Sequence, residues 1–261
     1  DAAPVTCNNS LQEGDEMKEE ILFDKLPFLD SIQPDRRQQI LKYFRTAPDS
    51  LADHLIIENL VPNRVFVREG APVEYVYLIA TGIIKATDYR VFGTEFDFIR
   101  FDKTYAMGAM EVLMKLSNFL TTLTTVTKCT IIKIPIEPYS RWLFSDLDAL
   151  QLESQLMGEY LLEQSRLARA YLFLQGADRL MYLLIRKYEK YGNNGVYHFH
   201  VNQQNLANET GLVVKTVGRA IKKMEEEGLI SRSQKFVLIN HEQYLRMKEY
   251  VDRLIYLNDD K

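Results

Sequence analysis

Residues 201–230, VNQQNLANETGLVVKTVGRAIKKMEEEGLI, decide the fold of the C-terminal part of the chain. Asn202 can cap a short helix that runs to about Thr210, because its side-chain oxygen can accept a free backbone N–H of the first turn. Gly211 then supplies a tight turn, and the following residues predict a second helix over about 214–227. Two short helices joined by a glycine turn are typical of a helix-turn-helix, whose second helix enters a groove of DNA.

The second predicted helix is amphipathic. Its apolar residues recur at helical spacing and are expected to face inward, which leaves basic residues on or near the outer surface. These are Lys215, Arg219, Lys222 and Lys223. Gly228 ends the helix, and the stretch ISRSQKFVLI that follows predicts a hairpin with a polar, basic tip over residues 231–235. Such a wing can lie against phosphates. The alternative is a helical hairpin whose charged surface is merely solvated.

Composition and charge agree with a regulator of more than one domain. The chain has 261 residues, of which 46% are hydrophobic, and its net charge is −4. The charge is uneven, since the residues from 178 onward carry +3 and the rest carry −7. No run of about twenty apolar residues and no secretory signal is present, which predicts a cytoplasmic protein without a membrane segment. Cys7 and Cys129 are too few for a disulfide framework or a zinc site, so no cofactor or metal is expected.

Residues 148–174 form the longest uninterrupted helical pattern of the chain. One apolar stripe along it follows the alternating four and three spacing of paired helices, which predicts a dimer interface. The residues of this stripe are Leu150, Ser154, Met157, Leu161, Gln164, Ala168 and Tyr171. A second stripe, which includes Leu152, Leu156 and Leu174, can cover another part of the same chain. The alternative is a core helix inside a monomer.

Residues 55–136 change character and become rich in β-branched and aromatic residues. Runs such as VYLIA, FDFIRF and TIIKI predict short strands joined by turns, hence an all-β sandwich or barrel. Residues 17–47 are expected to be helical, and the fold class is α+β. The predicted domains are a disordered leader over residues 1–16, a β-roll sensor over 17–147, a dimerisation helix over 148–175 and a winged helix over 176–261.

The order of these parts resembles the transcription regulators related to the catabolite activator protein and the fumarate–nitrate regulator (the CRP/FNR family). The stretch GAPVEYVYLIATG at 70–82 is similar to the glycine-bounded β-roll signature of that family. The stretch at 211–222, with its core TVGR at 216–219, is similar to the family's recognition helix. The resemblance implies a sensing β-roll of the cyclic-nucleotide-binding type, a central dimer helix, a winged helix that reads DNA near promoters, and contact with RNA polymerase.

The phosphate cassette that the resemblance implies for binding of cyclic AMP is incomplete. A glutamate should follow Gly108, and an Arg next to a Ser or Thr should come about ten residues later, because a buried phosphate needs a cation. Ala109 stands at the first position, and Phe119 and Leu120 stand at the others. We therefore expect an unknown small apolar or aromatic effector near Tyr160, Gln164 and Ser165, or constitutive binding of DNA. An iron–sulfur cluster would need four thiolates, and only two cysteines are present.

The predicted DNA-reading residues also depart from the family pattern. Where members that read a TGTGA-like half-site have an Arg and a Glu before TVGR, this chain has Val214 and Lys215. Val214, Lys215 and Arg219 are the predicted base contacts, so the preferred half-site should differ from TGTGA. The predicted phosphate contacts are Asn202, Gln203, Gln204, Lys222, Ser231, Arg232 and Lys235.

The sequence predicts a homodimeric regulator that binds double-stranded DNA at a palindromic promoter site. The alternative is a ligand-binding signalling module whose winged helix makes protein contacts. No pair of acid and base, nucleophile motif or phosphate loop appears, so an enzyme is not expected.

Overall fold

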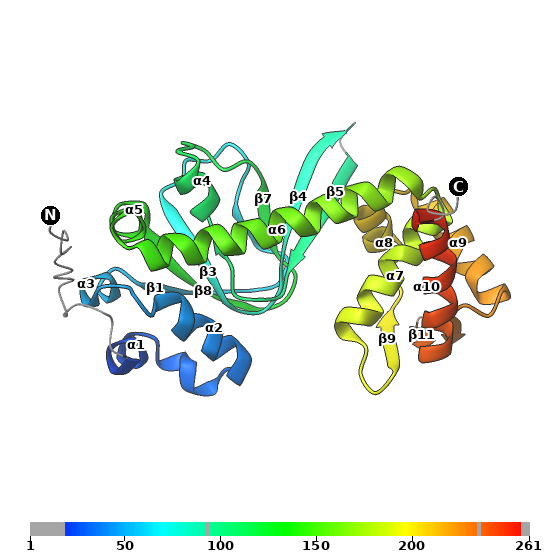
Figure 1. The fold of residues 1–261 in the computed structure, drawn as a ribbon, viewed down its shortest axis with the longest axis horizontal. Helices are drawn as coiled ribbons and strands as arrows, with labels where there is room; N and C mark the ends of the chain where they lie inside the picture. The colour runs from blue at the N-terminus through cyan, green and yellow to red at the C-terminus, as the bar shows by residue number, and fades with distance from the viewer. Residues whose placement is uncertain (1–18, 92–93, 234–235, 257–261) are drawn as a thin grey trace, which may run out of the picture. The chain divides into compact units, whose positions relative to one another are not determined.

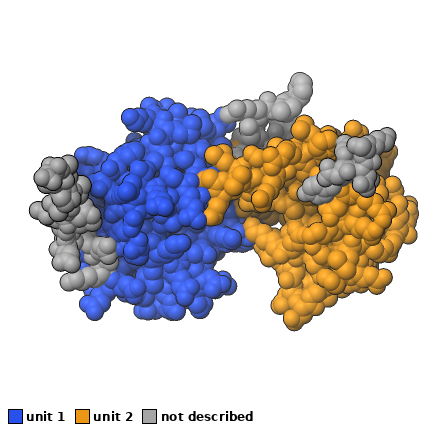
Figure 2. All heavy atoms as spheres, in the orientation of Figure 1, with its two compact units in different colours: residues 1–84, 101–157 blue, residues 85–100, 158–261 orange. Residues whose placement is uncertain are grey.

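The computed structural model describes residues 19–91, 94–233 and 236–256, which fall into two compact units (Figure 2). Unit 1 comprises Asp1–Ile84 and Phe101–Met157, and unit 2 comprises Lys85–Arg100 and Gly158–Lys261. No described helix is long and apolar enough to cross a membrane.

Unit 1 begins with short helices that share a core with a sheet. They are α1 (Glu19–Lys25), the 3-10 helix η1 (Pro27–Ser31), α2 (Pro34–Phe44) and α3 (Asp49–Ala52). Pro34 occupies the first turn of α2, where its missing N–H removes no helical hydrogen bond. The helical character predicted for residues 17–47 is confirmed for the described residues.

Two antiparallel sheets carry the β-rich region (Figure 1). The first has the order β1-β8-β3-β6, from β1 (Ile56–Leu60), β8 (Cys129–Pro135), β3 (Tyr75–Thr81) and β6 (Ala106–Met107). The second has the order β2-β7-β4-β5, from β2 (Val65–Val67), β7 (Thr122–Thr125), β4 (Ile84–Val91) and β5 (Thr94–Phe101). Along β3, Val76, Leu78 and Ala80 are fully buried in the core with the helices, as the alternation of a strand requires.

Three further helices follow β6 along the chain. They are α4 (Ala109–Leu113), α5 (Ile136–Ser145) and the long α6 (Leu147–Phe173). In unit 1, Leu152 and Leu156 of α6 pack against the core, and the Tyr105 hydroxyl donates to the Leu156 carbonyl at 3.2 Å. The long helix predicted over 148–174 is therefore confirmed, and its predicted second stripe covers its own chain in these turns.

Unit 2 contains the predicted winged helix. Its elements are α7 (Ala177–Tyr191), β9 (Val196–His200), α8 (Gln203–Thr210), α9 (Val214–Glu226), β10 (Ser231–Ser233), β11 (Phe236–Asn240) and α10 (His241–Tyr256). The hairpin β10–β11 is joined by β9 into a sheet of order β10-β11-β9. The sequence did not predict β9, because the alternating run VYHFH carries histidines rather than a clear polar face. Helix α10 contributes Met247 and Val251 to the core of unit 2.

Candidate nucleic-acid interface

The first helix of the helix-turn-helix is fixed at both ends by its own residues. The Asn202 side-chain oxygen accepts the Asn205 backbone N–H at 3.1 Å, which confirms the predicted cap. At the other end Gly211 has a φ of +67°, a backbone conformation that favours glycine and ends α8. The chain thereby turns sharply into α9.

Helix α9 presents one face to the core and one to solvent. Val217, Ala220, Ile221 and Met224 are buried on the inner face. Gly218 lies against α8, where a Cβ added to it would be 3.4 Å from the Gln203 amide oxygen. This close crossing of the two helices holds the outer face of α9 in a fixed orientation, which a DNA-reading helix requires.

The predicted base contacts lie on the exposed side of α9. All three are exposed: Val214 is 37% exposed, and Lys215 and Arg219 are exposed along the same face. Lys215 and Arg219 are four residues apart, so their side chains start from neighbouring positions on the helix. Within the described ranges neither forms an ion pair. Both cations are consequently available to an anionic partner such as DNA.

The predicted phosphate contacts differ in whether they already have a partner within the protein. Lys222 is 3.7 Å from Glu226 and Arg232 is 3.9 Å from Glu225, in pairs whose side chains are all more than a third exposed. Exposed ion pairs of this kind contribute little stability, so these cations can exchange a glutamate for a phosphate at small cost. The Ser231 hydroxyl accepts a hydrogen bond from Gln243 Nε2 at 3.0 Å. Lys235 lies outside the described residues.

The amides at the start of α8 are also partly engaged within the domain. Gln204 donates from Nε2 to Asn208 Oδ1 at 2.8 Å, and Gln203 packs against Gly218. Asn202 uses its oxygen as the helix cap, which leaves its amide N–H group for another acceptor. Asn202 and Gln204 remain exposed, whereas Gln203 is half-buried.

In the predicted cyclic-nucleotide cassette, two of the positions hold side chains that pack inside the protein. Ala109 and Phe119 are buried, and the Phe119 ring lies 6.2 Å from the Tyr77 ring. Gly108 has a φ of +101°, and Leu120 is 42% exposed. The backbone of Phe119 exchanges hydrogen bonds with Gly70 and Ala71. An aromatic ring thus lies where the family pattern requires an arginine.

Glu111 is an acidic residue two positions after Ala109, where the family pattern has the glutamate. It is 5% exposed, and burial raises the pKa of its carboxyl group, although hydrogen bonds from the backbone N–H groups of Glu111 and Leu120 oppose this shift. Its carboxyl group is thus hydrogen bonded to the backbone of residues 111 and 120.

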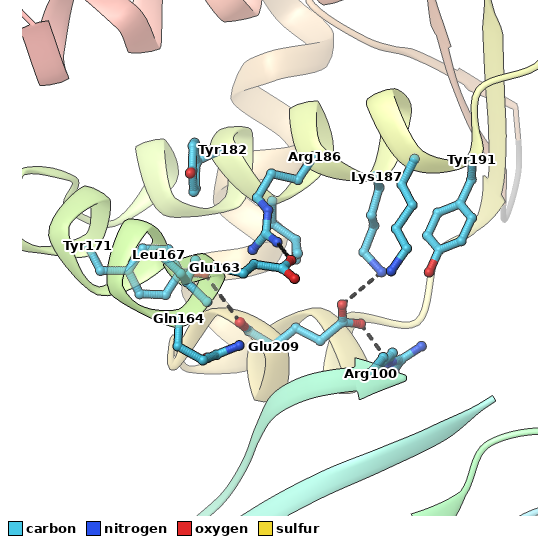
Figure 3. Close-up of a pocket in the computed structure, with 12 residues that line it drawn as sticks. Arg100, Glu163, Gln164, Leu167, Tyr171, Tyr182, Arg186, Lys187, Tyr191 and Glu209 are labelled. Atoms are coloured by element: carbon cyan, nitrogen blue, oxygen red, sulfur yellow. Dashed lines mark hydrogen bonds and ion pairs between the residues drawn. The ribbon is translucent and has the colours of Figure 1, made fainter. Parts of the chain in front are cut away.

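In unit 2, Gln164 lines a cavity of about 110 Å³ (Figure 3). The walls include Arg186, Lys187 and Glu209, whereas Tyr160 is half-buried on α6 and Ser165 is exposed. The lining is thus charged and aromatic.

The cavity contains an ion cluster that the sequence did not predict. The Glu209 carboxylate of α8 lies 2.7 Å from Lys187 Nζ of α7 and 3.1 Å from Arg100 of β5 (Figure 3). The Tyr171 hydroxyl donates to the Glu209 carbonyl at 3.4 Å, and burial raises the Tyr171 pKa to about 12. Arg100 and Glu209 are far apart in the sequence, and no local pattern could pair them.

The residues of the predicted dimer stripe differ in exposure along α6. Leu161 is 53% exposed, Ser154 and Ala168 are exposed, and the others are half-buried. The half-buried members are Leu150, Met157, Gln164 and Tyr171. The Ser154 hydroxyl donates to the Leu150 carbonyl at 2.7 Å. Within unit 2, Leu162, Leu172 and Phe173 are further exposed apolar residues of α6.

Comparison with known proteins agrees with this geometry. Residues 165–247 match the family model of the Crp-like helix-turn-helix domain. Among curated proteins, none matches the sequence. A similar solved structure is that of the c-di-GMP responsive global regulator CLP of Xanthomonas campestris, with 21% identity and a TM-score of 0.64 over 72% of this chain and 95% of that one.

Two further solved structures have the same fold. A CRP/FNR-family transcriptional regulator from Thermus thermophilus is 16% identical, with a TM-score of 0.62 over 74% of this chain and 98% of that one. FixK2 from Bradyrhizobium japonicum is 13% identical, with a TM-score of 0.61 over 74% and 96%. The predicted resemblance is confirmed: the chain has the fold of CRP/FNR regulators, and its C-terminal part is a Crp-like helix-turn-helix domain.

Proposed function

We propose that this chain, with a Crp-like helix-turn-helix domain on a CRP/FNR-type fold, is a homodimeric transcription regulator that binds DNA directly. The observation that carries the proposal is the pair Lys215 and Arg219 on the outer side of α9, without an ion-pair partner in the described part of the chain. Arginine can donate two hydrogen bonds to a guanine edge, and lysine can contact a guanine or a phosphate. Val214 would pack on a thymine methyl group.

In this proposal the remaining polar residues position the domain on the DNA backbone. They are Asn202, Gln203, Gln204, Lys222, Ser231, Arg232 and Lys235. Phosphate contacts fix orientation without reading sequence, and each cation that neutralises a phosphate adds to the salt dependence of binding.

Selection from a randomised double-stranded DNA library tests the base contacts. The selected half-site should differ from TGTGA, and Arg219→Ala should cost about 1 to 3 kcal/mol and relax base preference at one position. Arg141→Ala, an exposed arginine on α5 of unit 1, is the matched control and should leave affinity unchanged. Uniform weakening across all sequences by Arg219→Ala would show that this residue contacts phosphate only.

The salt dependence separates this proposal from a signalling module that binds protein. A dimer that contacts several phosphates should lose affinity steeply as the salt concentration rises, because counterions are released from DNA. An affinity that hardly changes with salt would favour the protein-binding alternative.

We further propose that a second copy covers the exposed apolar residues of α6. The support is the predicted seam together with the exposure of Leu161 and neighbouring leucines in unit 2. Sedimentation analysis should show a dimer, and Leu161→Asp should convert it to a monomer. Phe144→Asp, at a 54% exposed apolar position of α5, is the control and should remain dimeric. A wild-type monomer at micromolar concentration refutes this part.

The effector is proposed to be a compound other than cyclic AMP, or to be dispensable. The buried Phe119 ring supports this, because it stands where a cation is required and cannot neutralise a phosphate. The residues proposed to contact the effector are Gly108, Ala109, Phe119, Leu120, Tyr160, Gln164 and Ser165. Calorimetric titration with cyclic AMP should show no tight binding, and tight binding would overturn this statement.

The domain organisation proposed for this function follows the sequence prediction. A sensor over residues 17–147, a dimerisation helix over 148–175 and a winged helix over 176–261 would act on RNA polymerase at a promoter. Transcription from a reconstituted promoter, with and without the protein, tests that contact.

A further inference from the structure

Three helices of unit 1 meet at a buried carboxyl group that the proposed function does not use. Glu153 of α6 is 4% exposed, and it faces Tyr43 of α2 and Tyr139 of α5, which are 6% and 0% exposed. Its sequence position gave no signal, because a glutamate inside a long helix is usually solvated.

The three side chains form one hydrogen-bonded cluster. The Tyr43 hydroxyl donates to Glu153 Oε2 at 2.8 Å and lies 2.8 Å from the Tyr139 hydroxyl, which is itself 3.5 Å from the same carboxyl oxygen. Each hydroxyl has one proton, so Tyr139 can donate to Tyr43 while Tyr43 donates to Glu153.

Among the described residues, the titratable groups that face Glu153 are these two tyrosines, one from α2 and one from α5. In the described part of the chain no lysine, arginine or histidine forms an ion pair with it. The ion pair Arg45–Asp148, which also joins the end of α2 to α6, lies at the surface with both side chains 61% exposed.

The chemistry of the cluster follows from this lack of a cation. Burial raises the Glu153 pKa to about 7, although the hydrogen bonds from Tyr43 and Tyr139 act in the opposite direction. Burial also raises the pKa of both tyrosines well above the ordinary value, so they stay neutral. Around neutral pH, Glu153 therefore changes from a neutral acid to a buried anion.

We propose that Glu153 is a pH-sensitive switch that sets how firmly the first turns of α6 pack on α2 and α5. When the carboxyl group is protonated, a neutral cluster holds the three helices together. When it loses its proton, the cluster must accommodate an uncompensated charge, and the packing loosens. Since α6 also bears Ser154 and Met157 of the proposed dimer seam, the effect of the switch on DNA binding rests on the proposed function, whereas the change in packing does not.

The single tryptophan of the chain provides a direct readout. Trp142 lies 5.9 Å from the Tyr43 ring and 5.9 Å from the Tyr139 ring, measured between centroids. Its fluorescence in the wild-type protein should follow one titration between about pH 5 and about pH 9, with a midpoint near 7 and a tenfold change in the ratio of the two forms per pH unit.

Three variants decide the assignment. Glu153→Gln, which mimics the protonated form, should abolish the transition, and Glu159→Gln on an exposed position of the same helix should preserve it. Tyr43→Phe should raise the midpoint, because it removes a hydrogen bond that favours the ionised carboxylate. This shift provides a test even if Glu153→Gln does not fold. A transition that persists in Glu153→Gln, or a wild-type signal that is flat with pH, overturns the proposal.

The consequence for DNA binding is measured separately. The affinity for a selected DNA site should vary between about pH 6 and about pH 8 more in the wild-type protein than in Glu153→Gln, beyond any change shared by both. A fluorescence transition without any DNA binding would leave the switch intact and refute the proposed function. If the DNA affinities of the wild-type protein and Glu153→Gln differ by the same factor at every pH, the switch does not affect DNA binding and acts only on the packing within unit 1.

Discussion

Replacement of Glu209 by glutamine should destabilise unit 2 by about 3 to 5 kcal/mol. Its side chain is 10% exposed, and those of its partners Lys187 and Arg100 are 15% and 24% exposed. At an effective dielectric constant of about 20, each pair attracts by about 4 kcal/mol when the charges are about 4 Å apart. Desolvation offsets much of this attraction in the wild type, but the variant keeps the desolvated cations and loses both attractions.

Urea unfolding followed by Trp142 fluorescence, together with hydrogen exchange, measures the effect on each unit separately. Trp142 reports on unit 1, so its transition should not move, whereas hydrogen exchange of the α8 amides should lose protection in Glu209→Gln. Glu249→Gln removes a surface pair with Arg253, both 66% exposed, and should cost less than about 0.5 kcal/mol.

A further variant tests the reasoning behind the magnitude. Replacing Glu209, Lys187 and Arg100 together by apolar residues of similar volume should restore most of the lost stability, because no unpaired charge then remains buried. If Glu209→Gln alone lowers the free energy of unfolding of unit 2 by less than about 1 kcal/mol, the view that the cluster is desolvated is refuted.

Three other predictions concern single positions. Asn202→Ala should destabilise unit 2 by about 1 kcal/mol through loss of the α8 cap, measured by thermal unfolding, and no change would mean that the cap is not formed in solution. Met247→Ala, at a fully buried position, should cost about 2 to 5 kcal/mol in urea, and Leu245→Ala, 49% exposed, should cost far less; equal losses would contradict the core position of α10. Because the folded-state pKa of Glu153 is raised from 4.5 to about 7, its contribution to stability is full below pH 4.5 and lost as pH rises to 7. The difference in unfolding free energy between wild type and Glu153→Gln should therefore change by at most about 3 kcal/mol over that range, and a constant difference would speak against the raised pKa.

Local patterns were sufficient to predict the helix-turn-helix and the following hairpin of the C-terminal unit, but not β9. The cap at Asn202, the turn at Gly211 and the exposed cations of α9 each depend on residues within one or two turns of chain. The spacing of apolar residues likewise predicted α6 and the strands of the β-rich region.

The charged clusters could not be predicted in the same way. Glu153 meets Tyr43 over 110 positions of sequence, and Glu209 meets Arg100 over a similar separation. In the sequence each of these acids resembles an ordinary surface residue of a helix. Only the packing of distant elements removes them from water, and no single-sequence pattern records that packing.

The division of the chain into units has a consequence for its synthesis. Lys85–Arg100 is grouped with Gly158–Lys261, and it leaves the ribosome before the rest of its unit exists. Neither unit is a continuous segment, so vectorial folding cannot finish one before the intervening residues of the other have emerged. A nascent chain halted shortly after residue 157 should leave Arg100 without Glu209, its ion-pair partner in α8, until translation is complete.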